Sequence, residues 1–224
     1  MKKILAIMHT TDATISSLRK IVQRQFPEVT IFNLLDDSLL PEINREGKIT
    51  ASVRKRFYNL AANAEEAGAD VLFSACSSIG GLIDEADERL KIPCVRIDEA
   101  MAEDAVRRAG KITVAATVAS TLSPTRELLE RKARAKGKQI DLNTLLIKEA
   151  GQYLNAGETE KYERLISDEI AAAIPESECI VLAQASMASA LERLPQDNVT
   201  IPILSSPESG VASLAPYLKQ SAAQ

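Results

Sequence analysis

Short apolar runs alternate with amphipathic stretches along most of the chain. In the first half, the apolar runs predict strands at 3–8, 29–34, 71–74 and 94–97, and the amphipathic stretches predict helices at 13–25, 51–67, 80–90 and 99–109. Strands that are apolar throughout are typical of parallel sheets whose two faces are both covered by helices. The alternation therefore predicts an α/β fold. The longer polar connection at 35–50 is predicted to be a loop.

The same alternation begins again near residue 111. The second half has predicted strands at 111–116, 140–145, 179–183 and 202–204, and predicted helices at 125–136, 158–173, 187–193 and 207–219. Ser123 is expected to cap the first of these helices, with Pro124 at its first position. Gly157 is expected to separate two helical segments.

Three pairs of segments match between the halves at an offset of about 108 residues. Segment 3–7 corresponds to 111–115, segment 71–78 to 179–186, and Ile92-Pro93 to Ile201-Pro202. A single match would carry little weight, but three in the same order indicate a duplicated α/β unit. The halves are expected to be related by pseudo-two-fold symmetry and to pack closely, because no long linker separates them.

Composition excludes several classes of protein. The 224 residues include 27 Lys and Arg against 31 Asp and Glu, a net charge of −4 that is unlike the basic surface of a nucleic-acid binder. Trp is absent and aromatic residues make up only 4%, which disfavours a stacking platform for bases. No segment approaches the roughly 18 apolar residues of a membrane helix. We therefore expect neither nucleic acid nor a membrane as a partner.

The cysteine and histidine counts bear on location and metals. Three cysteines without paired spacing do not make a disulfide framework, and the apolar run near the N-terminus is too short for a signal peptide. We expect a cytoplasmic protein with reduced thiols. A single histidine and the lack of a Cys-x-x-Cys pair disfavour a zinc site. Gly80-Gly81 lacks the pattern of a phosphate-binding loop, so nucleotide binding is not expected.

Polar residues follow four of the predicted strands, at 9–11, 75–81, 117–121 and 183–187. Ligands of open parallel sheets bind at the carboxyl ends of the strands. The four segments carry small hydroxyls, one thiol, one amide and one imidazole. Hydroxyls together with backbone N–H groups at helix N-termini suit a carboxylate or another small anion. Pseudo-symmetry is expected to bring the four segments to one cleft.

Cys76 and His9 are the candidates for chemistry at these strand ends. Cys76 stands before Ser77, Ser78 and a predicted helix, whose N-terminus favours a thiolate. The alternative is a buried structural cysteine, which fits the other two cysteines better. His9 is interpreted either as an acid, base or carboxylate-orienting group or as a hydrogen-bonded residue at a strand end. Asp36-Asp37 lies in a loop that could approach the cleft, but its sequence context is not specific.

The strand ends resemble those of the aspartate/glutamate/hydantoin racemase superfamily, which includes maleate isomerases and arylmalonate decarboxylases. The resemblance rests on His9-Thr10, Ala75-Cys76-Ser77-Ser78, Ala116-Thr117 with Ser120-Thr121, and the segment 182–187, and it extends over essentially the whole chain. It implies two flavodoxin-like domains, each with a parallel sheet, and an active site in the cleft between them. The end of the chain is expected to return to the first domain, giving 1–98 plus 205–224 and 99–204. The resemblance also implies a homodimer.

Racemases of this superfamily use one cysteine from each half and need neither a metal nor pyridoxal phosphate, so no cofactor is expected. Cys76 matches the first cysteine, but Gln184 stands at the second position and cannot act as an acid or base. Cys179 does not replace it, because it lies five residues earlier, roughly 16 Å away along a strand. One thiol remains compatible with protonation after decarboxylation, with isomerisation through addition to a double bond, or with racemisation assisted by His9 or water.

These observations predict a racemase or isomerase that acts on an amino acid or small carboxylate. Cys76, Gln184 and His9 are the predicted catalytic residues, with Gln184 donating to an oxyanion or holding a substrate amide or carboxylate. The predicted substrate-binding residues are Thr10, Ser77, Ser78, Thr117, Ser120, Thr121, Ala185 and Ser186. The alternatives are a decarboxylase or other lyase of the same superfamily, and a non-catalytic protein that binds a small carboxylate.

Overall fold

The computed structural model describes residues 2–195, 197 and 199–219. The chain divides into two compact units, unit 1 with Met1–Ile97 and Pro207–Gln224, and unit 2 with Asp98–Ser206. Residue 1 and residues 220–224, which the sequence assigned to the first domain, lie outside the described residues.

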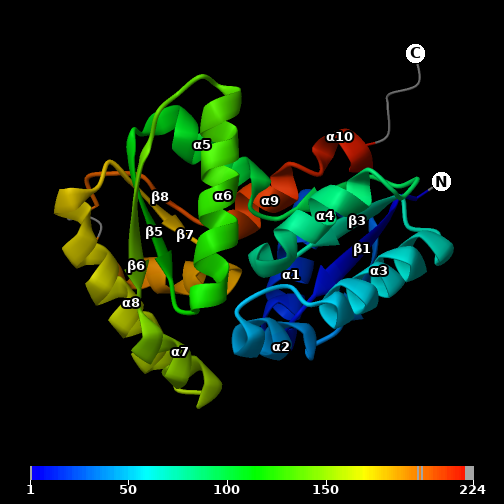
Figure 1. The fold of residues 1–224 in the computed structure, drawn as a ribbon, viewed down its shortest axis with the longest axis horizontal. Coiled ribbons are helices and arrows are strands. Elements are labelled where there is room, and N and C mark those ends of the chain that lie inside the picture. The colour runs from blue at the N-terminus through cyan, green and yellow to red at the C-terminus, as the bar shows by residue number, and fades with distance from the viewer. Residues whose placement is uncertain (1, 196, 198, 220–224) are drawn as a thin grey trace. The chain divides into compact units, whose positions relative to one another are not determined.

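Unit 1 is built on a parallel sheet of four strands in the order β2-β1-β3-β4 (Figure 1). Its strands are β1 (Ile4–His9), β2 (Thr30–Leu35), β3 (Val71–Ser74) and β4 (Cys94–Arg96). Unit 2 has a sheet of the corresponding order, β6-β5-β7-β8, with β5 (Lys111–Ala116), β6 (Asp141–Leu146), β7 (Cys179–Leu182) and β8 (Ile203–Leu204). All strand pairs are parallel. The predicted α/β class with two parallel sheets is confirmed.

The duplication extends to the register of the central strands. Leu5 of β1 lies opposite Val71 of β3, and Ile112 of β5 lies opposite Cys179 of β7. Strand β1 also pairs with β2 over six residues, and β5 pairs with β6 over six residues. Each half of the sequence therefore forms its own four-stranded sheet, and the two sheets have corresponding strand orders.

Helices connect the strands in both units. In unit 1 they are η1 (Asp12–Thr14), α1 (Ile15–Gln25), α2 (Leu39–Glu46), α3 (Ala51–Glu66), η2 (Ser77–Ile79) and α4 (Gly80–Asp87). In unit 2 they are α5 (Glu99–Arg108), α6 (Ala119–Ala135), α7 (Lys148–Asn155), α8 (Thr159–Ala173), η3 (Ile174–Glu176) and η4 (Ala185–Arg193). The chain closes with α9 (Ser206–Ala212) and α10 (Ala215–Leu218).

Alternate residues of each central strand enter different cores, because successive strand side chains point to opposite faces. In unit 2, Ile112 and Val114 of β5 pack with helices α5 and α6, whereas Ala115 packs with α7, α8 and η4. In unit 1, Ala6 and Met8 of β1 pack with α2, α3 and α4. Burying a large apolar side chain stabilises the fold by about 1.5–3 kcal/mol, so these layers hold the strand ends in place.

The C-terminal segment packs within unit 1 through α9. Gly210 lies so close to the end of β4 that a Cβ on it would stand 2.3 Å from the Ile97 carbonyl oxygen. Glu208 forms an ion pair with Arg24 at the end of α1 and accepts a hydrogen bond of 2.9 Å from the Gln25 side chain. A residue larger than glycine at this point would push the helix away from the sheet.

Two local predictions were wrong in instructive ways. Helix α6 begins at Ala119, so Pro124 lies inside the helix instead of at its first position. The Thr121 hydroxyl donates to the Val118 carbonyl at 2.7 Å, which adds a hydrogen bond to the extra N-terminal turn. Within the connection at 35–50, residues 39–46 form helix α2, which the sequence reasoning missed. Its buried side chains, Leu39 and Ile43, are spaced one turn apart.

Smaller differences concern the end of each half. The helix expected at 187–193 is a 3-10 helix that begins at Ala185, and the helix expected at 207–219 is divided into α9 and α10. Gly157, with φ at +73°, separates α7 from α8 as predicted. A positive φ is costly for residues with a Cβ, which explains the glycine at this point.

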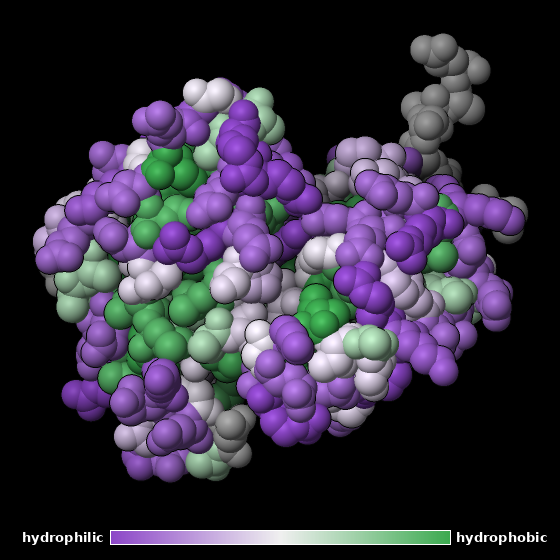
Figure 2. Space-filling model, in the orientation of Figure 1, coloured by the Kyte–Doolittle hydropathy of each residue, from purple (hydrophilic) through white to green (hydrophobic). Residues whose placement is uncertain are grey.

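Figure 2 shows how polarity is distributed over the visible face. Hydrophilic residues cover most of the helices, and on unit 2 hydrophobic residues gather where β6 runs in Figure 1. Strand β6 is an edge strand whose side chains are exposed or half-buried. Within the ranges the structure describes, no helix is both long and apolar enough to cross a membrane.

Candidate functional site

Cys76 lies immediately beyond the carboxyl end of β3, in the centre of the unit 1 sheet. It caps the short helix η2 with an extended backbone, φ −130° and ψ 116°. The preceding Ala75 N–H donates to the Met8 carbonyl at 2.9 Å, which ties this turn to β1. The sheet therefore carries the thiol to the edge where β1 also ends, and the Cys76 side chain is half-buried there.

Hydrogen-bond donors converge on the Cys76 thiol. The hydroxyls of Thr10 and Ser78 and the backbone N–H groups of Ser78 and Ile79 are placed where they favour a thiolate. Thr10 and Ser78 are only 3% and 2% exposed, and apart from the Cys76 sulfur their hydroxyls have no hydrogen-bond partner among the described residues. Buried polar atoms of native proteins are usually paired, and the Cys76 sulfur is the group to which these two hydroxyls can donate.

The net effect on the Cys76 thiol differs from the sequence expectation. Burial raises the pKa of Cys76, and this effect outweighs the Thr10 hydroxyl and the other donors, which lower the pKa. The free energy needed to take a thiolate out of water exceeds the stabilisation that these few hydrogen-bond donors provide. The resting thiol is therefore protonated near neutral pH. The pKa values of Cys94 and Cys179 are raised to about 12, chiefly by burial, which fits their interpretation as structural cysteines.

His9 is completely buried at the end of β1 and both of its ring nitrogens have partners. Nδ1 lies 2.8 Å from the Thr14 hydroxyl and Nε2 lies 3.1 Å from Oδ1 of Asn33. Burial lowers the pKa of His9, against the opposing effect of the Asn33 hydrogen bond, so the ring is neutral near pH 7. This geometry fits a positioning residue that links β1, β2 and η1 and so orients the adjacent Thr10.

A buried arginine, Arg96, supports the turn after Cys76. Arg96 of β4 is 5% exposed and pairs with Asp84 of α4 at 2.9 Å. Its guanidinium lies against Gly80, where a Cβ would come within 2.3 Å of two of its atoms. Gly80 therefore allows the guanidinium to pack under the start of α4. Sequence reasoning missed this contact, because no local pattern links a strand arginine to a glycine sixteen positions earlier.

Gln184 takes the place in unit 2 that Cys76 takes in unit 1. It follows β7, caps η4 with φ −126° and ψ 133°, and comes after an Ala183 N–H that donates to the Ala115 carbonyl. Its side-chain oxygen accepts from the Thr117 N–H at 2.6 Å, the Thr117 hydroxyl at 3.0 Å and the Val118 N–H at 3.2 Å. The two strand ends of unit 2 are thus joined through the Gln184 amide.

The remaining predicted residues of unit 2 lie on the same two strand ends. Thr117 and Thr121 are buried, and Ser120, Ala185 and Ser186 are half-buried. Sequence reasoning missed Tyr162 of α8, whose hydroxyl lies 3.1 Å from the Ser186 hydroxyl. Burial raises the pKa of Tyr162 to about 12. A tyrosine on the apolar face of a helix carries no local signal that distinguishes a hydrogen bond to a strand-end residue from simple packing.

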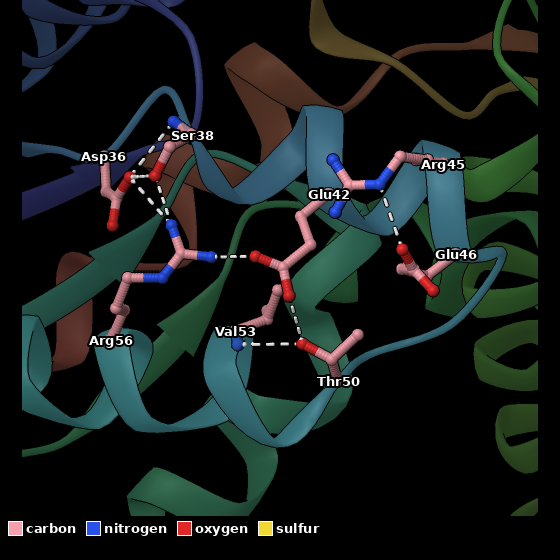
Figure 3. A network of polar contacts seen from close by, with 8 residues as sticks. All are labelled: Asp36, Ser38, Glu42, Arg45, Glu46, Thr50, Val53 and Arg56. Atoms are coloured by element: carbon pink, nitrogen blue, oxygen red, sulfur yellow. Dashed lines mark hydrogen bonds and ion pairs between the residues drawn. The ribbon is translucent and has the colours of Figure 1, made fainter.

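Asp36 belongs to a polar network at the end of β2 (Figure 3). Its carboxylate accepts from the Ser38 N–H at 3.0 Å and lies 3.6 Å from Arg56 of α3. In Figure 3 the Arg56 guanidinium points toward Asp36 and Ser38 and also toward Glu42 of α2. The Asp36 N–H donates to the His9 carbonyl at 3.2 Å. Asp36 therefore orders the connection between β2 and α2 through charges that are paired within the network.

The cavity of unit 1 lies away from Cys76. A cavity of about 460 Å³ lies at the opposite, N-terminal edge of the unit 1 sheet and is lined by Lys2, Lys3, Gln25, Phe26, Pro27, Glu28, Val29, Leu218 and Lys219. None of the residues around Cys76 contributes to it. In the part of the chain that the structure describes, no three His, Cys, Asp or Glu side chains are grouped so that they could hold a metal ion.

The fold is similar to that of several solved racemases at low sequence identity. A glutamate racemase from Bacillus anthracis has a TM-score of 0.74 at 16% identity, over 96% of this chain and 80% of that one. An aspartate racemase from Picrophilus torridus has 0.72 at 15%, over 96% and 94% of the two chains. An allantoin racemase from Klebsiella pneumoniae has 0.64 at 19%, over 96% and 88%. These likenesses concern the fold.

The similar structures show the fold, whereas sequence similarity shows the family. No functionally curated protein is similar enough in sequence to count as a match. The sequence model of the Asp/Glu/hydantoin racemase family matches residues 5–214, which include Cys76, Gln184 and every other strand-end residue described above. The chain therefore belongs to the Asp/Glu/hydantoin racemase family.

Proposed function

We propose that this chain is a cofactor-independent racemase or isomerase that acts on an amino acid or another small carboxylate through the thiol of Cys76. The observation that carries the proposal is the buried pair of hydroxyls beside this thiol, Thr10 and Ser78, which have no partner other than the Cys76 sulfur among the described residues. Both hydroxyls are placed to stabilise negative charge on this sulfur during the reaction. Membership of the racemase family supports the class of reaction.

In the proposed reaction Cys76 moves the α-proton of the substrate. The Cys76 thiol first gives its own proton to water. The thiolate then removes the α-proton and becomes a thiol again, while the electron pair of the C–H bond moves into the adjoining carboxylate to give an enediolate. The hydroxyls of Thr10 and Ser78 and the Ile79 N–H are donors that stabilise negative charge at this end of the sheet. A proton returned to the same face restores the substrate, and one delivered by water to the opposite face inverts it.

A lyase reaction is the second candidate, and the raised pKa of Cys76 favours it. A thiol that is protonated near neutral pH is ready to act as an acid. Loss of carbon dioxide from a dicarboxylate leaves the electron pair of the broken C–C bond in an enediolate. The Cys76 thiol protonates this enediolate on one face, and a proton from water restores the thiol.

The other site residues are assigned to substrate binding. Thr10, Ser77 and Ser78 have this role in unit 1, and Thr117, Ser120, Thr121, Ala185 and Ser186 have it in unit 2. His9 positions Thr10 without transferring a proton. The resemblance to the family supports a homodimer, and three cysteines without a disulfide support a cytoplasmic location. Both belong to the proposal.

The test is exchange of the α-proton in D₂O, followed by NMR with both enantiomers of aspartate and glutamate and with malonate. The wild type is expected to exchange at least one of these, and Cys76→Ser is expected to lower the rate by about 10²–10⁴-fold, the usual contribution of a general acid or base. Cys94→Ala, a buried cysteine in β4, is the matched control and should keep the wild-type rate.

The outcomes separate the candidates. Exchange without loss of carbon dioxide supports the racemase or isomerase reaction, and release of carbon dioxide supports the lyase. Tight binding of a carboxylate with no turnover supports a non-catalytic binding protein instead. Exchange by Cys76→Ser at the wild-type rate would show that the thiol does not move the proton.

A further inference from the structure

The side chain of Gln184 fills a group of converging donors at the end of β5. Its amide oxygen accepts from two backbone N–H groups, those of Thr117 and Val118, and from the Thr117 hydroxyl, at 2.6, 3.2 and 3.0 Å. Consecutive N–H groups of this kind form an anion-binding concavity. In this chain the concavity is occupied by a neutral oxygen from the chain itself.

These three contacts fix the orientation of the Gln184 amide. A backbone N–H can only donate, so the atom that faces Thr117 and Val118 must be the amide oxygen and not the nitrogen. The two N–H bonds of the amide nitrogen therefore point away from the concavity. No described residue accepts from them, and the Gln184 side chain is half-buried, so that it is accessible from the strand ends. Gln184 thus presents a fixed pair of donors.

We infer that Gln184 is a specificity-determining residue of unit 2, which donates both amide N–H bonds to a carboxylate or carbonyl oxygen of the substrate. This inference rests on the proposed function. An amide neither gains nor loses a proton at accessible pH, so unit 2 recognises the substrate instead of supplying a second acid or base. Only one proton-transferring residue, Cys76, then remains for the reaction.

The surroundings of the amide strengthen it as a donor. Hydrogen bonds in a chain polarise one another, so an amide whose oxygen accepts three bonds has more strongly polarised N–H bonds. The three donors are neutral and lie within unit 2, and the neighbouring Ser186 and Tyr162 hydroxyls are paired with each other. Among the hydrogen bonds of the described residues, no carboxylate contacts Gln184, so its N–H bonds have no competing acceptor of negative charge.

The substitution Gln184→Glu isolates this role. One carboxylate oxygen keeps the contacts with Thr117 and Val118, and the other replaces the NH₂ group, so a pair of donors becomes an acceptor without a change of shape. The ligand probes are D- and L-aspartate, D- and L-glutamate and malonate. Their binding is measured by titration calorimetry and as a shift of Tm. Gln152→Glu, an exposed residue of α7, is the control for the added negative charge.

The wild type and Gln152→Glu are expected to bind at least one probe with equal affinity. Gln184→Glu is expected to keep the Tm of the ligand-free protein and to bind that probe at least about tenfold more weakly, a change of about 1.4 kcal/mol. Wild-type affinity in Gln184→Glu overturns the inference and leaves the proposed function standing. Binding of none of these probes to the wild type overturns both.

A second variant covers the case in which Gln184→Glu does not fold. Gln184→Met removes both N–H donors without adding charge and keeps a side chain of similar length. It is expected to bind the same probe several-fold more weakly than the wild type. Undiminished affinity in Gln184→Met would overturn the inference, because the donors would then contribute nothing to recognition.

Discussion

The contact between Gly80 and Arg96 leads to a sharp prediction about the turn that holds Cys76. In Gly80→Ala, the new Cβ would lie 2.3 Å from Cζ and Nη2 of Arg96 and 2.7 Å from its Nε. The guanidinium has little freedom to move away, because its side chain is 6% exposed and pairs with Asp84 at 2.9 Å. The backbone itself admits alanine, since Gly80 has φ −56° and ψ −38°.

The expected loss follows from these distances. Carbon atoms pack best at about 3.5–4.0 Å, so the guanidinium must shift by more than about 1 Å. Overpacking of this kind costs about 1–3 kcal/mol, and the reduced entropy of the unfolded chain returns about 0.4–1 kcal/mol. We expect a net loss of about 1 kcal/mol for Gly80→Ala, which lowers Tm by about 2–4 °C in a chain of this size.

Gly81→Ala is the matched control, because a Cβ at Gly81 has no neighbouring atom within 4 Å. It lies in the same helix, is exposed, and is expected to stabilise the chain by about 0.4–1 kcal/mol. Urea denaturation of both variants and the wild type provides the free energies of unfolding. If Gly80→Ala is as stable as Gly81→Ala, Arg96 is not held against Gly80 as described here.

Three other outcomes are expected. The alkylation rate of Cys76 should still rise above about pH 9, because burial raises its pKa, and a plateau below about pH 8 in mass spectrometry would contradict this. Because burial holds the pKa of folded His9 below its usual 6.5, the unfolded chain binds the proton first and stability should fall as the pH drops below about 6.5; His9→Gln should reduce this loss in urea titrations, and an identical loss would refute the assignment. Tyr162→Phe should cost about 1 kcal/mol, since its buried hydroxyl pairs with Ser186, and a more stable variant would show that this pair contributes nothing.

Much of the architecture was accessible from local pattern alone. The strands β3 and β7 are apolar runs with polar residues at or just after their ends, and their positions followed from a few neighbouring side chains. The duplication followed from matches in a constant order, and the strand order of both sheets confirms it. Local reasoning was weakest where competing signals met, as at Pro124, where the extra turn of α6 outweighs the loss of one backbone hydrogen bond.

In the candidate site, too, the sequence placed the residues along the chain but did not reveal which atoms they contact. That Cys76 and Gln184 follow equivalent strands was evident in the sequence, because both positions depend on the repeat. Which atoms surround them was not, because the partners come from distant segments. The oxygen of Gln184 meets donors 67 and 66 positions earlier in the chain. The ring of His9 meets Asn33, which is 24 positions later.

Ionisation also depends on these distant partners. A helix N-terminus beside Cys76 favours a thiolate when it is considered alone, yet burial by the packed sheet and helices reverses the direction of the pKa shift. His9 is an ordinary candidate acid or base until burial and two hydrogen bonds hold it neutral. Sequence pattern places residues along the chain because hydrophobic periodicity is local. Protonation and the orientation of an amide depend on solvent exposure and on neighbours that only folding brings together.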